Sequence, residues 1–210
     1  TKEGKVNIES VERVYSNYSG VYDLIFGKIF ESGRETGIEL LDIKEDDNIL
    51  EVGVGTGLSL PYYPRHCKIV GVDLSAKMLK EAEKKIKENR LVNVQIHKMD
   101  ATRMEFEDNT FDSVMAAYFI STVPDPVKAA HEIKRVCKKG GRIVFLNHFI
   151  SKNKFISGFE KMISPVCCKI GFRTDLDLYD LLDKTGLKIN KKEKVNFFNY
   201  WKAVQCINNK

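Results

Sequence analysis

The 210-residue chain lacks the features that mark secreted and membrane-spanning proteins. Its five cysteines include no C-x-x-C pair, which favours reduced thiols and a cytoplasmic location. No apolar run approaches the ~20 residues that a membrane-spanning helix needs, and no secretory signal opens the sequence. There is no internal repeat, low-complexity segment or linker. We therefore expect a single domain over residues 1–210, with no metal site.

The charge balance does not identify a partner. The formal net charge is +5, and 30% of the residues are charged. Such a modest excess is compatible with an anionic lipid surface or a nucleic acid, but solvated lysine-rich faces are the commoner explanation.

A glycine-rich stretch, Asn48–Gly57, is the clearest motif. Three glycines at 53, 55 and 57 directly follow an apolar strand pattern that ends near Glu51. A dinucleotide fold needs G-x-G-x-x-G, but leucine stands where the third glycine should fall, and no Walker Gly-Lys-Ser/Thr is present. A carboxylate at Glu51 suits a cationic ligand and disfavours a phosphate. The pattern E-x-G-x-G-x-G resembles motif I of the class I methyltransferases that use S-adenosylmethionine (SAM).

Two further strand ends carry acids that fit this ligand. Asp73 follows the strand pattern at 68–72 and can accept both ribose hydroxyls. Asp100 follows the strand pattern at 94–97 and can accept the adenine amino group. The predicted cofactor contacts, for SAM and its product S-adenosylhomocysteine, are Tyr18, Glu51, Gly53, Gly55, Thr56, Gly57, Asp73, Leu74, Met78, Asp100, Ala101 and Ala117.

The order of elements predicts an α/β fold of the Rossmann-like class I methyltransferase type. We expect a seven-stranded, mostly parallel sheet with a C-terminal antiparallel hairpin, helices on both faces, and an N-terminal helical lid at 8–45. Strands are predicted at 49–52, 68–73, 94–97, 113–117, 142–146, 187–195 and 199–206. Helices are predicted at 34–41, 75–89, 124–138 and 175–184, the third ended by Gly140 and Gly141 and the last by Gly186.

Three tyrosines near the N-terminus have helical spacing. Tyr15, Tyr18 and Tyr22 would share one helix face. Ordinary core packing is one explanation, and a lid over the reacting centre is the other. His148 ends the fifth predicted strand and is the best-placed general base by sequence. We predict that Tyr15, Tyr22 and His148 form the catalytic, methyl-accepting part of the site.

The segment 150–172 is predicted to be an insert that contacts the substrate or a membrane. Phe155, Phe159, Met162 and Val166 follow helical spacing, and lysines lie between them. Pro165 is expected to break or bend the element. A cap over an apolar substrate, a basic amphipathic element for an anionic membrane surface, and a plain surface helix all remain open.

The resemblance extends beyond the fold to bacterial phosphatidylethanolamine N-methyltransferases (PmtA type). The stretches that carry it are 15–34, 51–61, 123–126 and 145–149, of which Leu58–Pro61 and Asn147–Phe149 are the more specific. The resemblance implies methylation of phosphatidylethanolamine and its methylated forms by a peripherally membrane-associated monomer.

Two alternatives remain. One is a methyltransferase for a quinone ring or another small molecule, and the other is a SAM-binding module without turnover. A nucleic-acid substrate is not expected, because the fourth strand ends in Ala117-Tyr118-Phe119-Ile120 where amine methylases of nucleic acids usually carry Asn/Asp-Pro-Pro-aromatic.

Overall fold

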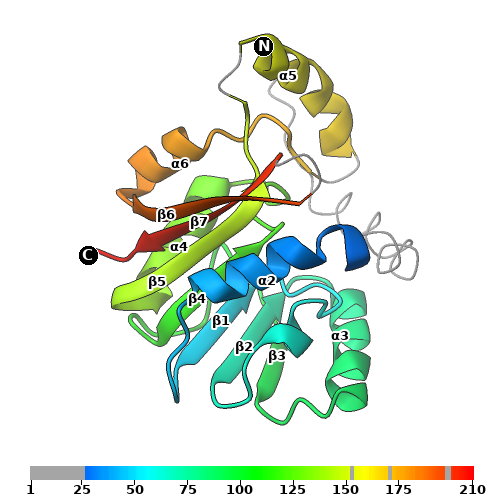
Figure 1. Cartoon of the computed structure of the whole chain (residues 1–210), viewed down its shortest axis with the longest axis vertical. Helices are drawn as coiled ribbons and strands as arrows, with labels where there is room; N and C mark the ends of the chain where they lie inside the picture. Colours follow the sequence, from blue (N-terminus) through cyan, green and yellow to red (C-terminus); the bar gives the residue numbers. More distant parts are fainter. Residues whose placement is uncertain (1–26, 152–153, 170–171, 197–199) are drawn as a thin grey trace.

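Seven strands form one sheet in the computed structural model, which describes residues 27–151, 154–169, 172–196 and 200–210 (Figure 1). The strand order is β3-β2-β1-β4-β5-β7-β6. Strands β1 to β5 pair in parallel, and β7 is antiparallel to both of its neighbours, β5 and β6. The strands are β1 (Asn48–Val52), β2 (Lys68–Asp73), β3 (Val94–Lys98), β4 (Phe111–Ala117), β5 (Cys137–His148), β6 (Lys188–Val195) and β7 (Trp201–Ile207). The predicted sheet with its terminal hairpin is confirmed.

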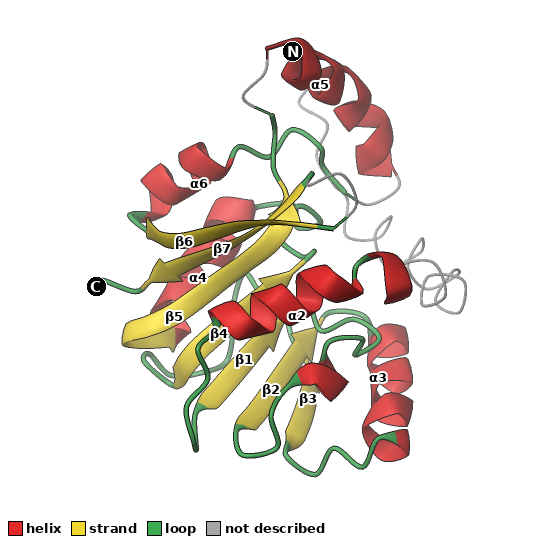
Figure 2. Ribbon diagram, viewed as in Figure 1, coloured by secondary structure: helices red, strands yellow, loops and turns green. Residues whose placement is uncertain are grey.

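Helices cover both faces of the sheet, as predicted (Figure 2). The central strands are buried on both sides, so Ile49 packs in one apolar cluster and its neighbour Leu50 in the other. Residues of α2 and α3 belong to the Ile49 cluster, and residues of α4 and α6 to the Leu50 cluster. The helices are α2 (Glu31–Leu40), α3 (Ala76–Glu88), α4 (Pro126–Val136), α5 (Lys154–Lys169) and α6 (Leu178–Thr185), with a short 3₁₀ helix η1 (Leu60–Tyr62).

The junction between α4 and β5 differs from the prediction. The helix ends at Val136 and the strand starts at once at Cys137, so Gly140 and Gly141 lie within the strand instead of ending the helix. The Asn208 side chain makes this possible. Its amide donates to the carbonyls of Lys134, Cys137 and Lys138 at 3.0, 2.8 and 3.2 Å, so a residue distant in sequence satisfies the helix end.

Helices α5 and α6 can also be compared with their predictions. Pro165 was predicted to break or bend the segment 150–172. Helix α5 continues through it to Lys169, so the proline does not break the helix. Helix α6 begins after Asp177, whose carboxylate accepts from the amides of Tyr179 and Asp180, and ends at Gly186 in a left-handed conformation, as predicted. Within the described ranges, none of the helices is both long and apolar enough to cross a membrane.

The parallel strands bring their carboxyl ends to one edge of the sheet. The loops that follow β1, β2, β3 and β4 meet there, and β5 ends at the same edge and leads toward α5 (Figure 1). In open α/β sheets, ligands bind at this edge. The predicted lid residues 8–26 lie outside the described residues.

Candidate active site

The turn after β1 has a left-handed backbone at each of its three glycines. The φ angles are 75° at Gly53, 55° at Gly55 and 77° at Gly57, a region that favours glycine. The Gly53 amide donates to Val72 O at 2.9 Å, which ties the turn to β2. A Cβ at Gly53 would lie 2.3 Å from the Phe119 ring. Glycine is therefore required at position 53 by both conformation and packing.

Asp73 holds the glycine turn in place from the end of β2. Its Oδ2 accepts from the Gly55 amide and its Oδ1 from the Ser75 amide, both at 2.9 Å. Ser75 in turn caps α3 by accepting from the Met78 amide at 3.3 Å. One carboxylate thus links the glycine turn, β2 and the start of α3, and its oxygens lie at the edge where a ligand would sit.

A cavity of about 350 Å³ lies at the carboxyl ends of β1 to β4. Its size matches the lower range of small-molecule sites, about 300–1,000 Å³. Ten of the predicted cofactor contacts line it: Glu51, Gly53, Gly55, Thr56, Asp73, Leu74, Met78, Asp100, Ala101 and Ala117. Gly57 is not part of the lining, because it faces Leu60 and Ala82 inside the turn. Tyr18 lies outside the described residues.

Glu51 is buried in the cavity wall, with 1% of its surface exposed. Burial raises the pKa of its carboxyl to about 7, opposed by the hydroxyls of Ser59 and Tyr63 and by the charge of Arg34. Among the described residues, its Oε2 has no hydrogen-bond partner. A buried acceptor without a partner is costly, and a cationic donor in the cavity would satisfy it.

Several residues of the lining are not among the predicted cofactor contacts, although Tyr118, at the end of the fourth strand, was expected to border the site. Arg34 reaches the cavity from α2, with 4% of its surface exposed. Tyr118 and Phe119 follow β4, and Tyr118 has a φ of 55°. The Tyr118 hydroxyl accepts from Asn196 Nδ2 at 2.8 Å and lies 3.3 Å from Phe30 O, to which it donates. The sequence signal for Arg34 was that it is the only basic residue of α2, the helix that precedes the glycine strand.

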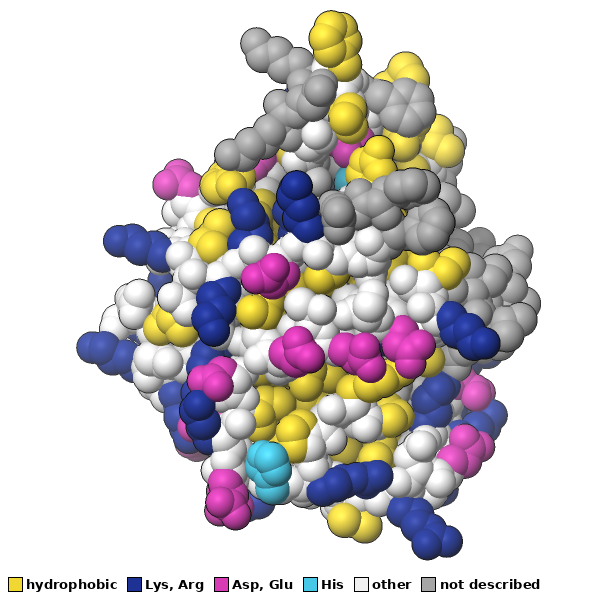
Figure 3. Space-filling view, in the orientation of Figure 1, with side chains coloured by type: hydrophobic (Ala, Val, Ile, Leu, Met, Phe, Trp, Pro, Cys, Tyr) yellow, Lys and Arg dark blue, Asp and Glu magenta, His cyan; other side chains and the backbone are white. Residues whose placement is uncertain are grey.

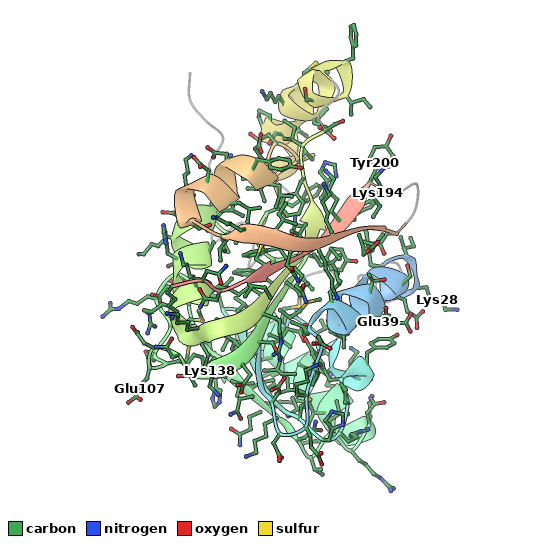
Figure 4. The ribbon with its side chains drawn as sticks, turned by 60° about the vertical axis from the view of Figure 1, so that its left-hand side comes forward. Lys28, Glu39, Glu107, Lys138, Lys194 and Tyr200 are labelled. Carbon is green, nitrogen blue, oxygen red and sulfur yellow. The ribbon has the colours of Figure 1, made fainter. Side chains whose placement is uncertain are left out.

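His148 ends β5 but does not line the cavity. Its Nε2 lies 3.2 Å from Glu160 Oε1 on α5, and its Nδ1 lies 3.3 Å from Tyr200 O. Burial lowers the pKa of this imidazole, although the Glu160 carboxylate opposes the shift. Figure 4 labels Tyr200 close to Lys194, where the β6–β7 hairpin reaches this end of the sheet. Tyr15 and Tyr22 lie outside the described residues, so the catalytic trio stays a prediction.

Known proteins with similar sequences are methyltransferases. The family described as "Methyltransferase domain" matches residues 50–145. The phosphatidylethanolamine N-methyltransferase of Cereibacter sphaeroides is 37% identical over 171 residues, which cover 81% of this chain and 83% of the relative. The demethylmenaquinone methyltransferase of Staphylococcus saprophyticus is 31% identical over 205 residues, which cover 92% and 87%.

Solved structures share the fold at lower identity. A SAM-dependent methyltransferase from Aquifex aeolicus has a TM-score of 0.70 at 20% identity, covering 92% of this chain and 97% of that one. A Haemonchus contortus phosphoethanolamine N-methyltransferase, solved with phosphomonomethylethanolamine and S-adenosylhomocysteine, has a TM-score of 0.76 at 19% identity. Here the match covers 96% of this chain and 59% of the other.

The fold, the glycine turn and these relatives together define the class. The chain belongs to the class I SAM-dependent methyltransferases. Within that class it resembles the bacterial phosphatidylethanolamine N-methyltransferases. Its cofactor is SAM, and the residues present fit this group, because a buried carboxylate oxygen without a partner and a strand-end aspartate both face the cavity. The alternative of a binding module without turnover is therefore set aside.

Proposed function

We propose that the protein methylates the amine of phosphatidylethanolamine and of its mono- and dimethylated forms. The 37% identity to the Cereibacter sphaeroides enzyme supports this acceptor. The structural observation that supports a membrane-bound acceptor is the position of α5 after β5, whereas the choice of phosphatidylethanolamine rests on the identity to that relative. Helix α5, with its exposed apolar side chains, lies beyond the carboxyl end of β5, the end of the sheet that also holds the cavity (Figure 1).

The base of the α5 segment is joined to the rim of the cavity. The Arg173 amide, just after α5, donates to Ser121 O at 2.9 Å, in the loop that follows β4. Glu160 of α5 contacts His148 and also accepts from the Ser151 amide at 2.8 Å. A surface carried by α5 is thereby held next to the reacting centre, which suits an acceptor whose tail stays in a membrane.

The reaction requires a neutral amine aligned with the methyl group. SAM supplies, when bound, a methyl group on a positively charged sulfur. An alkylammonium has a pKa of ~10.4, so the site must remove its proton. Burial lowers the pKa of His148, but its two ring nitrogens face Glu160 Oε1 and Tyr200 O and the ring does not line the cavity, so the assignment of His148 as the base stays a proposal. Much of the rate gain would come from orientation.

A quinone ring is the second candidate acceptor. Demethylmenaquinone methyltransferases match 92–93% of this chain at 28–31% identity. Such an acceptor is also apolar and is also extracted from a membrane, so α5 alone does not separate the two substrates.

A panel of acceptors tests the proposal. The purified protein is incubated with methyl-labelled SAM and one of four acceptors: phosphatidylethanolamine vesicles, phosphatidylglycerol vesicles, soluble phosphoethanolamine or a demethylmenaquinol. We expect label in phosphatidylethanolamine and none in phosphatidylglycerol, which has no amine. Label in the quinol alone, or in phosphoethanolamine alone, would contradict the proposed acceptor.

A further inference from the structure

The buried side of helix α5 is polar. Among the α5 side chains that the structure describes, only Glu160 and Ser164 are buried, and these two lie one helical turn apart. Phe155, Met162 and Val166 are exposed instead, and neither apolar cluster of the described residues includes a side chain of α5. A surface helix usually packs its apolar stripe on the core. Hydrogen bonds and charge therefore attach α5 to the sheet, in place of apolar burial.

Glu160 joins α5 to three other segments of the chain. Its Oε1 lies 3.2 Å from His148 Nε2 at the end of β5, and its Oε2 accepts from the Ser151 amide at 2.8 Å. Its backbone carbonyl accepts from the Thr174 hydroxyl, beyond the end of α5, at 2.7 Å. The residue is 6% exposed, so separating α5 from these partners would leave a buried carboxylate unsatisfied, which is costly.

The segment after α5 connects this attachment to the rim of the cavity. Arg173 precedes Thr174, and its amide donates to Ser121 O at 2.9 Å. Ser121 belongs to the loop that follows β4, and the next residue, Thr122, lines the cavity. Contacts made by two neighbouring residues thus link Glu160 to the cavity wall.

We infer that Glu160 is a positioning residue, whose carboxylate holds α5 at the end of β5 and thereby sets how the methyl acceptor enters the cavity. Glu160 itself does not line the cavity, so it acts through His148 and Ser151 and not on the acceptor. The statement about the acceptor rests on the proposed function, whereas the attachment of α5 does not depend on it.

Hydrogen exchange tests the attachment without any acceptor. We expect Glu160→Ala to speed the exchange of the α5 amides about ten- to a hundredfold, the factor that corresponds to a hydrogen bond with a charged group. Glu160→Gln keeps an acceptor oxygen and should recover part of the protection. Glu81→Ala is the matched control, because it removes a glutamate that pairs with Lys84 at 2.8 Å on α3, and it should leave α5 unchanged.

Exchange of α5 at the wild-type rate in Glu160→Ala would overturn the inference. If that variant does not fold, Thr174→Val removes only the hydroxyl that donates to the Glu160 carbonyl. This variant should speed the same amides by a smaller factor, and unchanged exchange in it would overturn the inference equally.

Kinetics with phosphatidylethanolamine vesicles test the effect on the acceptor. Glu160→Ala should raise the KM for the lipid about tenfold and change kcat less than about twofold, because Glu160 does not touch the reacting atoms. Its affinity for S-adenosylhomocysteine, measured by calorimetry, should equal that of the wild type. A fall in kcat at unchanged KM would place Glu160 in the chemical step and overturn the positioning role. Faster exchange of α5 in a protein that methylates no lipid would support the attachment and contradict only the proposed acceptor.

Discussion

Glu51 is an ionisable residue in a strand whose other inward residues are apolar, and burial controls its proton. Its pKa is raised from 4.5 to about 7, with burial as the largest cause. The folded protein without cofactor therefore holds this proton at a pH where the unfolded chain has released it. A cationic ligand favours the ionised form, so cofactor binding should release a proton below neutral pH.

The raised pKa of Glu51 predicts a pH-dependent stability. Because the folded state binds the proton more tightly, the free energy of unfolding falls as pH rises from about 4.5 to about 7, by roughly 3 kcal/mol in total. Glu51→Gln carries no such group. Urea unfolding without cofactor should show the wild type losing stability relative to this variant between about pH 4.5 and about pH 7. Parallel pH profiles for the two proteins would show that Glu51 ionises normally.

Some site residues follow from local sequence and others do not. The glycines of the turn and Asp73 were predictable because each lies at the end of a strand that the local sequence pattern shows. Arg34 was not, because its place in the wall depends on how closely α2 approaches β4. The partner of His148 was not predictable either, because the contact with Glu160 depends on how α5 is placed relative to the end of β5.

Helix α5 carries the most exposed apolar side chains in the part of the chain that the structure describes, Val92 apart. Phe155 is 91% exposed, Met162 67% and Val166 64%. They share the helical spacing of one face, and hydrophobic side chains gather at the α5 end of the molecule (Figure 3). Lys161 is exposed on the same helix, whereas the side chains of Lys154 and Lys169 are not described and Lys152 lies outside the described residues. An amphipathic helix with basic residues is typical of membrane-surface contact.

Removing the apolar face of α5 should reduce membrane binding. We expect Phe155→Ser with Met162→Ser to weaken cosedimentation with anionic vesicles, since each side chain contributes about 1.5–3 kcal/mol when fully buried. Val92→Ser is the matched control, because Val92 is 95% exposed in the turn between α3 and β3, at the other end of the sheet. Equal vesicle binding by both variants and the wild type would assign the membrane contact elsewhere.

At the scale of elements, periodicity located every strand of the sheet, and its errors fell at boundaries. The sequence placed the end of α4 at two glycines, but the side chain of Asn208, far along the chain, satisfies the helix end earlier. Pro165 was expected to break or bend the insert, and the helix α5 runs through it unbroken. The end of α4 is determined by a residue that is distant in sequence, and a local sequence pattern cannot show such a contact.

In the whole molecule, the candidate functional features lie at one end of the sheet. The cavity, the end of β5 and the root of α5 all lie there, and α2 leads into the sheet from the same side (Figure 1). For the acceptor that we propose, this arrangement would give access to the cofactor from a membrane surface. The single-domain organisation and the tyrosine lid at 8–26 remain predictions, as does the monomeric state.

Lipid analysis in a living cell tests the central claim most directly. The chain is expressed in a bacterial host that makes phosphatidylethanolamine but no phosphatidylcholine, and the lipids are analysed by mass spectrometry. Asp73→Ala, which removes the carboxylate that holds the glycine turn, serves as the cofactor-deficient control. We expect mono-, di- or trimethylated phosphatidylethanolamine with the wild type and none with the control. An unchanged phospholipid profile with well-expressed, SAM-binding wild type would contradict it.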